Sequence, residues 1–307
     1  MKMLTKKVLY LYMFKQEHNN NHKQNKTMTT SLSTIVKLDS VRKTNKYILS
    51  LFEGLKFDAR YHSYRFDKED LVNASSFSSK LMPPFNPEMS NIVAKSKGAK
   101  GLPSNPEYYT QRWSFKRDEA ANRGSRVHLF AEQYPILDDA ECPLEQGVCN
   151  FYDFMEQQGY EVICMELRMT DGVLAGTCDL LLRHKVTGKY VIADWKTNAK
   201  DIEAINYYNK PIVLLPHLQD TDSNKFACQL SIYSYLLAKK GIIVEELWLI
   251  HLSETMYEDN FKVIQVPTID LEPMLQEGQP LMTLLQDFKV ELAKKKAERE
   301  AKWKNRY

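Results

Sequence analysis

VICMELRMTDGVLAGTCDLLLRHKVTGKYVIADWK, residues 162–196, is the stretch of the sequence that decides the fold. It divides into three apolar segments, 162–169, 173–183 and 190–195. Asp171-Gly172 separates the first two, and an Asp-Gly pair between apolar segments is a strong hairpin signal. A second polar turn, ending at Gly188, precedes the third segment. Short connections of this kind join antiparallel strands, so the stretch predicts a three-stranded meander.

Helices are expected on either side of the meander. Pro106 heads a run to residue 133 that predicts a long helix with a break at Gly124, and 144–158 predicts a second helix. A third helix over 225–239 and a further strand over 244–252 follow. The order α-β-β-β-α-β predicts an α/β (α+β) architecture, with a mixed central sheet flanked by helices.

Three regions are expected along the chain. Residues 1–47 form a basic tail that we expect to be disordered, because its Asn-, His-, Gln- and Lys-rich part has little to bury. Residues 48–288 form one domain with the motif core at 106–252, and 289–307 form a basic C-terminal helix. Within the domain, 61–67 predicts a strand and 75–81 a short helix halted by Pro83.

The charge is divided unevenly over these regions. The tail carries a net +8 and the C-terminal helix +5, so the domain between them carries −10 of the total of +3. Basic ends on an acidic body suit a protein whose ends meet a polyanion while its centre holds cations. Two solvated tails are the alternative interpretation.

Composition excludes several classes of protein. No apolar run reaches the roughly 20 residues that span a bilayer, so we expect no membrane association and a cytoplasmic location, in the host if a phage encodes the chain. Five cysteines without a CxxC pair indicate reduced thiols. The phosphate-binding pattern GxxxxGK[ST] does not occur, which argues against a nucleotide hydrolase or a fused helicase.

Acidic residues lie inside the three predicted strands. Asp194 and Lys196 project from one face of the third strand, with Trp195 on the other. Asp179 lies in the second strand and Glu166 in the first. Carboxylates on adjacent strands about 4.8 Å apart are able to share one divalent cation, and hard oxygen ligands favour Mg²⁺ or Mn²⁺. Each acid has a structural alternative; Glu166, for example, would face solvent or pair with a nearby arginine.

Two predicted helices carry polar residues at i,i+4 spacing, which places each pair on one helix face. His128 and Glu132 lie on the first, one turn after Gly124, and the acid would orient the imidazole as a metal-ligating histidine requires. Gln229 and Tyr233 lie on the last helix, at the border of its apolar stripe. Taken singly, both pairs are equally compatible with ordinary amphipathic helices.

Taken in order, the series resembles the successive motifs of RecB-like nucleases of the PD-(D/E)XK superfamily, a group that includes many phage exonucleases. The motifs are Gly124-xxx-His128-xxx-Glu132, Glu166, Gly176-xx-Asp179, Asp194-x-Lys196 and Gln229-xxx-Tyr233. The resemblance covers residues 61–252 and implies a restriction-endonuclease-like sheet and a metal-dependent DNA nuclease, in its exonuclease branch. The role implied is hydrolysis of phosphodiester bonds in DNA recombination, repair or phage DNA processing.

The resemblance also implies a role for each residue. Asp179 and Asp194 would bind the catalytic Mg²⁺ or Mn²⁺, together with the backbone carbonyl of Trp195, and His128 would be a further ligand or would hold one. Glu166 belongs to the same catalytic set. Lys196 would position or deprotonate the attacking water or stabilise charge on the phosphate. Gln229 and Tyr233 would contact the DNA backbone, with Gly124, Glu132 and Gly176 in support.

Two features limit what the resemblance implies. Some members of the group hold an iron–sulfur cluster, but no cysteine follows Cys228 here, so we expect no such cluster. A structure-selective endonuclease and a non-cleaving DNA-binding module on the same fold remain alternatives. DNA is the expected partner, with a separate helicase or a single-strand-annealing recombination protein as a second one.

Overall fold

The computed structural model describes residues 46–82, 86–133, 140–206, 210 and 212–304. Almost all of the expected N-terminal tail therefore lies outside the described residues. None of the described helices combines the length and the apolar character needed to cross a membrane.

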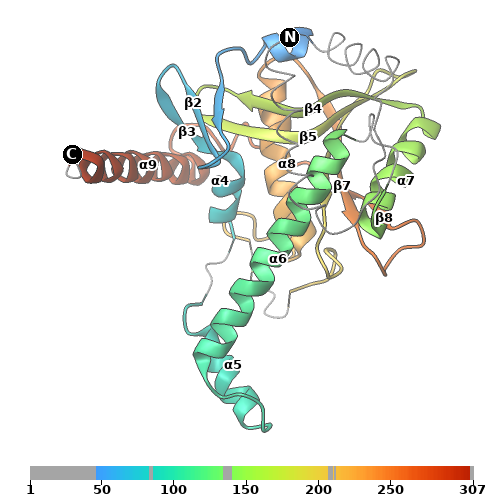
Figure 1. Ribbon diagram of the computed structural model, residues 1–307. Coiled ribbons are helices and arrows are strands. Elements are labelled where there is room, and N and C mark those ends of the chain that lie inside the picture. Colours follow the sequence, from blue (N-terminus) through green and yellow to red (C-terminus); the bar gives the residue numbers. More distant parts are fainter. Residues whose placement is uncertain (1–45, 83–85, 134–139, 207–209, 211, 305–307) are drawn as a thin grey trace.

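An open mixed sheet of eight strands forms the centre of the molecule (Figure 1). The expected meander is present as β4 (Tyr160–Thr170), β5 (Leu174–His184) and β6 (Tyr190–Lys196), each antiparallel to the next. The crossover helix α8 (Asp222–Ala238) returns the chain to β7 (Val244–Leu252), which runs parallel to β6. The prediction of a mixed sheet flanked by helices is thus confirmed. A further antiparallel strand, β8 (Phe261–Val266), was not predicted.

The chain before the motif core adds three short strands to the sheet. They are β1 (Lys56–Asp58), β2 (Ser63–Phe66) and β3 (Glu69–Asn73), preceded by helix α3 (Lys46–Ser50). Only β2 was expected from the sequence. The turns between these strands use non-glycine residues with positive φ, His62, Asp67 and Lys68, so the glycine signals that normally mark such turns are missing.

Strand β5 has two different neighbours along one of its edges. Its first residues pair in parallel with β3, through Val72–Leu174 and Asn73–Ala175. Its later residues pair with β6, starting at Leu180–Ala193. Between the two, residues 176–179 have no strand partner on this edge among the described residues. We call this the β5 gap; it opens the sheet where Gly176 and Asp179 lie.

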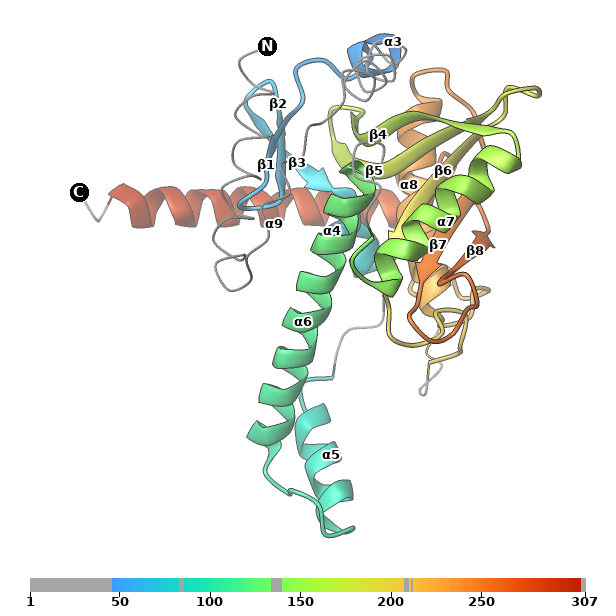
Figure 2. The same ribbon diagram turned by 45° about the vertical axis from the view of Figure 1, so that its right-hand side comes forward.

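Helices cover both faces of the sheet (Figures 1 and 2). One face packs against α8, α4 (Ala74–Lys80) and the start of α9 (Pro280–Lys304). The other packs against α7 (Pro143–Gln157) and the last turns of α6 (Pro106–Gln133). Each face thus has its own apolar core, and a third, small cluster contains Tyr64, Leu71 and Ala175. The β5 gap lies between α6 and α8, which reach it through His128 and Tyr233.

Two helices differ from the expectation. The break at Gly124 is wrong, because α6 is one continuous helix of 28 residues. The basic C-terminal segment does not begin a helix of its own: it continues α9, whose first turns bury Leu281 and Leu285. The unpredicted helix α5 (Met89–Gly98) packs against the start of α6, and together they project from the body as an arm (Figure 2).

Candidate metal and nucleic-acid site

Two buried aspartates lie side by side on β5 and β6. Asp194 is 3% exposed and Asp179 is 9% exposed. Asp179 Oδ2 accepts a hydrogen bond of 2.8 Å from the backbone N–H of Trp195. The Trp195 ring packs against Phe151 of α7 at 5.1 Å between ring centroids. Because side chains alternate along a strand, this packing directs Asp194 and Lys196 to the opposite face, as the sequence predicted.

Lys196 is the direct partner of Asp194. Its Nζ contacts Asp194 Oδ2 and lies 4.1 Å from the centre of the Phe226 ring on α8. Burial, and then the charge of Asp179, raise the pKa of Asp194 above its usual value in spite of the ammonium. Apart from that contact, Asp194 Oδ2 has no hydrogen-bond partner among the described residues. An oxygen in this condition is suited to a cation.

The α6 face of the gap contributes a second cluster. One ligand atom each from His128, Glu166 and Asp179 lies within 4.8 Å of the others. His128 Nδ1 is 3.4 Å from Asp179 Oδ2. Glu166 lies opposite Asp179 in the β4–β5 ladder, between the pairs Met165–Leu180 and Leu167–Cys178. Its φ of 50° is a left-handed conformation that glutamate rarely adopts, and such strain occurs preferentially at functional sites.

The protonation of this cluster reflects crowded negative charge. Burial alone would lower the pKa of His128, but the adjacent carboxylate of Asp179 raises it to about 9. Burial and the charge of Asp179 raise the pKa of Glu166 to about 7. Burial would also raise the pKa of Asp179, yet the charges of His128 and Lys196 hold it below its usual value. A divalent cation would neutralise the same negative charge that the proton on Glu166 and the imidazolium of His128 neutralise in its absence.

Helix α8 reaches the gap through Tyr233. Gln229 Nε2 donates a hydrogen bond of 2.6 Å to the Tyr233 hydroxyl. Tyr233 is only 3% exposed, and its ring lies against Gly176 so closely that a Cβ added there would stand 2.3 Å from Cε1. Gly176 is therefore required for this approach. Gln229 and Tyr233, predicted to act as a pair, are brought to the same edge as the aspartates.

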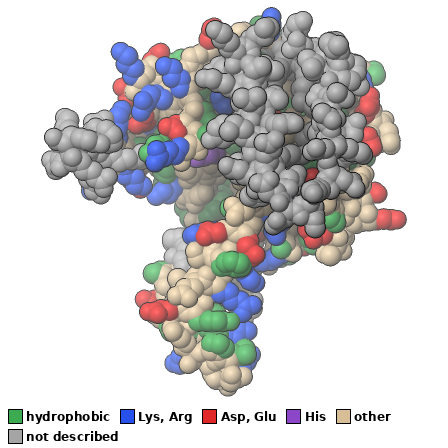
Figure 3. Space-filling view, in the orientation of Figure 1, with side chains coloured by type: hydrophobic (Ala, Val, Ile, Leu, Met, Phe, Trp, Pro, Cys, Tyr) green, Lys and Arg blue, Asp and Glu red, His purple; other side chains and the backbone are tan. Residues whose placement is uncertain are grey.

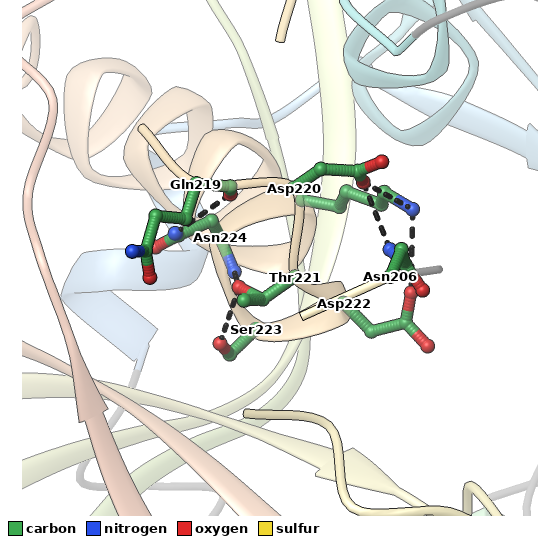
Figure 4. Close-up of polar contacts among 8 residues, drawn as sticks. Asn206, Gln219, Asp220, Thr221, Asp222, Ser223 and Asn224 are labelled. Atoms are coloured by element: carbon green, nitrogen blue, oxygen red, sulfur yellow. Dashed lines mark hydrogen bonds and ion pairs between the residues drawn. The ribbon is translucent and has the colours of Figure 1, made fainter. Parts of the chain in front are cut away.

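A network at the start of α8 fixes the helix in place (Figure 4). The Thr221 hydroxyl accepts from the Asn224 N–H at 3.1 Å and caps the helix. Buried Asp220 binds Asn206 Nδ2 at 2.8 Å and Lys225 Nζ at 3.1 Å. These contacts tie the loop after β6 to the helix that carries Gln229 and Tyr233.

Three predicted residues of α6 differ in how they relate to the gap. His128 and Glu132 both line a small pocket with Glu166, Asp179 and Trp195. Gly124 was expected to permit a close approach, but among the described residues an added Cβ there would meet only Thr197 Oγ1, at an ordinary 3.6 Å. The role of the Trp195 carbonyl stays a prediction.

The sequence did not identify two residues that hold the chain beyond Lys196. Arg123 of α6 donates to the Thr197 carbonyl at 3.0 Å. His251 of β7 is fully buried and lies 2.9 Å from the Asn198 carbonyl through Nε2, with the Tyr257 hydroxyl 2.7 Å from Nδ1. Because a carbonyl oxygen only accepts, Nε2 of the neutral imidazole carries the hydrogen and donates to Asn198, and Nδ1 accepts from the Tyr257 hydroxyl. A lone histidine inside the apolar strand 244–252 was the available signal.

We expect Gly176→Ala to lower both stability and any activity of the site. The new methyl group would displace the Tyr233 ring, and overpacking of this kind costs about 1–3 kcal/mol. Denaturant unfolding would measure the loss. Gly124→Ala is the matched control, because it adds the same methyl group in ordinary contact and should stabilise α6 by up to about 1 kcal/mol. Equal stabilities of the two variants would contradict the packing described here.

Comparison with known proteins adds little to this geometry. No family model and no curated protein matches the chain. Sixteen chains of solved structures show a similarity. One of them, described as "Crystal structure of SSO0001", is 13% identical, with 84% of this chain and 86% of that chain covered at a TM-score of 0.34. That value is too low to support an argument about fold or function. The class of protein that fold and site define is therefore a mixed α/β protein with a buried carboxylate cluster at a gap in its sheet.

Proposed function

We propose that this protein is a divalent-metal-dependent DNA nuclease of the PD-(D/E)XK type, in the RecB-like exonuclease branch. The proposed core is restriction-endonuclease-like, built from α6 and α7, the meander, α8 and β7. The proposed cofactor is Mg²⁺ or Mn²⁺, with DNA as substrate and a separate helicase or annealing protein as a further partner. The proposed role is DNA end processing in recombination, repair or phage DNA metabolism.

One observation carries the proposal: residues separated by up to 98 positions in the sequence, from His128 to Phe226, converge on the β5 gap from both faces of the sheet. His128 and Glu166 meet Asp179 on one side. Asp194 and Lys196 meet on the other, where α8 adds Phe226. An apolar core does not require so many buried charged groups. Burying them costs desolvation free energy, which favours a functional role for the cluster.

The residues present fit a hard divalent cation. Asp179, Asp194, Glu166 and His128 offer oxygen and nitrogen ligands, and the orphaned oxygen of Asp194 is already free of protein hydrogen bonds other than the Lys196 contact. When bound, such a cation neutralises charge on a phosphodiester and makes a water nucleophile available near neutral pH. Cys149, Cys164, Cys178 and Cys228 are free thiols buried in the fold.

The protein's own residues supply the remaining functions. Lys196, held by Asp194 and by the Phe226 ring, presents an ammonium that orients water and stabilises negative charge on the phosphate oxygens. The Trp195 N–H donates to Asp179 Oδ2 and so fixes the carboxylate, and His128 Nδ1 approaches the same oxygen at 3.4 Å. Gln229 is half-buried, bonded to Tyr233, and offers its remaining amide atoms to the DNA backbone.

We expect Mg²⁺ to stabilise the protein more strongly as the pH rises from about 6 to 9. Glu166 and His128 have raised pKa values, near 7 and 9, so the metal-free fold loses their contribution to stability as the pH rises through those values. A cation competes with these protons below that range and replaces them above it. Thermal unfolding with Mg²⁺ and with EDTA across this range would show the widening difference in Tm. A difference that is constant or shrinks would count against metal binding in this cluster.

The experiment that tests the function is incubation of purified protein with end-labelled linear DNA and with closed circular DNA, in Mg²⁺, Mn²⁺ or EDTA. Metal-dependent loss of linear DNA alone supports the exonuclease. Nicking of circles would instead indicate a structure-selective endonuclease. Binding of DNA without cleavage in either metal would indicate a non-cleaving module and overturn the proposal.

A further inference from the structure

The arm formed by α5 and α6 has a rigid base and an exposed outer face. Tyr109 is buried between the two helices and donates a hydrogen bond of 2.7 Å to the Pro103 carbonyl. Ala94 of α5 is also buried. Beyond this contact, eight consecutive residues of α6, 115–122, are exposed all round the helix. The helix crosses solvent here and then enters the body at His128.

Aromatic and basic side chains alternate along one stripe of α6. Tyr108, Arg112, Phe115 and Lys116 follow the i, i+4, i+7, i+8 spacing of a single helix face and are all exposed. Phe115 is 64% exposed and Tyr108 41% exposed. An Arg112 Nη donates to the Tyr108 hydroxyl at 3.2 Å, which holds the two side chains together. We call these four residues the arm stripe; Figure 3 shows hydrophobic and Lys/Arg side chains beside one another on the projection.

The charge of the arm sets it apart from the body. Residues 89–123 contain seven Lys and Arg against three acids, a net +4, so the rest of residues 48–288 carries −14. An exposed aromatic ring beside a basic residue is the combination that binds a nucleic-acid strand, in which rings stack on bases and cations meet phosphates. A purely hydrophobic docking face would have no need of the basic residues.

Helix geometry links the arm stripe to the site. Phe115 and His128 lie on the same helix, 13 residues apart, which corresponds to roughly 20 Å. A strand stacked as in B-form DNA advances about 3.4 Å per nucleotide and spans this distance in about six nucleotides, whereas an extended single strand spans it in fewer. A strand with its phosphate at the β5 gap therefore reaches Phe115 only if it extends several nucleotides from the site.

We propose that the arm stripe binds a single-stranded DNA extension leading to the β5 gap and thereby makes substrate binding depend on strand length. The inference rests on the proposed nuclease function and adds to it a surface remote from the metal-binding residues. Tyr108 and Phe115 stack on bases, and Arg112 and Lys116 neutralise phosphates.

The test compares the full chain with Phe115→Ala/Lys116→Ala. The matched control is Lys185→Ala/Val186→Ala, which removes an adjacent basic and exposed apolar pair from the β5–β6 turn, where Val186 is 87% exposed. Fluorescence anisotropy in Ca²⁺ would measure binding of labelled single strands of about 2 nucleotides, too short to reach Phe115 even when extended, and of about 20 nucleotides. We expect the arm variant to bind the longer strand about tenfold more weakly and the shorter one unchanged. The control variant should match the wild type on both.

Each other outcome overturns the inference. If the arm variant had an unchanged affinity for the long strand, or lost affinity equally for both strands, the arm stripe would not be the surface that binds the extension. A change in oligomeric state by analytical ultracentrifugation, with DNA binding unaffected, would assign the stripe to a second copy of the chain. Failure of the nuclease proposal is recognised separately: length-dependent binding through the arm would persist in a protein that cleaves nothing.

Discussion

Asp194→Asn should reduce metal-dependent DNA cleavage about a thousandfold or more while the protein stays folded. The substitution keeps the size of the side chain but removes the charge that lies buried beside Asp179 and Lys196. On the proposed function, the site then loses a metal ligand and much of its attraction for a divalent cation. Single-turnover cleavage of a labelled oligonucleotide would measure the loss, and circular dichroism would confirm folding.

Asp220→Asn is the matched control for this prediction. Asp220 is also buried and also pairs with a lysine, Lys225, but it belongs to the network at the start of α8. We expect a loss of stability with cleavage reduced no more than a few-fold. Similar losses of cleavage in both variants would indicate that Asp194 acts through folding and not through the metal.

Lys196→Met should lower the cleavage rate about 100- to 1000-fold and leave DNA binding nearly unchanged. Methionine keeps an unbranched side chain of similar length but removes the ammonium that contacts Asp194 and the Phe226 ring. The buried Asp194 carboxylate then lacks its partner, which costs about 3–5 kcal/mol in the metal-free protein. Cleavage rates, DNA affinity in Ca²⁺ and denaturant unfolding in EDTA would measure the three effects.

Two further variants separate catalysis from structure at this position. Lys196→Arg keeps the charge but not the compact, exchangeable amine, so we expect it to restore stability more than activity. Lys225→Met removes another lysine bound to a buried aspartate and should leave the rate within a few-fold of wild type. Full cleavage by Lys196→Met would contradict the role assigned to the ammonium.

Periodicity and turn chemistry were sufficient to predict the centre of the fold. In the strands of the meander, apolar and polar residues alternate or all residues are apolar, and turns at Asp171-Gly172 and Gly188 separate the strands. The order β4–β5–β6 therefore followed from local signals. The parallel return to β7 followed from the crossover helix. The short strands β1 and β3 were missed because they have only three and five residues, and because the turns that join them to β2 use non-glycine residues with positive φ.

The site was predictable as a set of residues but not as an arrangement. The sequence places Asp179, Asp194 and Lys196 on neighbouring strands, and the structure brings them together. The β5 gap depends on the parallel pairing of β3 with Leu174 and Ala175, a long-range contact without local signature. His251 and Arg123 act through backbone carbonyls after Lys196, and such contacts depend on tertiary packing that no spacing rule encodes.

The left-handed conformation of Glu166 is a further feature that the sequence could not reveal. From the sequence alone, the side chain of a glutamate inside a strand is expected to point to the face opposite that of its two neighbours, as in any regular strand. The positive φ re-aims it toward His128 and Asp179, so the third carboxylate joins the cluster through a local irregularity of β4.

The most direct test of the central claim is single-turnover cleavage of a labelled linear DNA by EDTA-treated protein to which Mg²⁺ is returned, for wild type beside Asp179→Asn and Asp194→Asn. We predict that Mg²⁺ restores cleavage in the wild type only, and that calorimetry detects the cation binding to the wild type and not to either variant. Cleavage that survives both substitutions, or a wild-type protein that binds Mg²⁺ in this cluster and hydrolyses no DNA, would contradict the account.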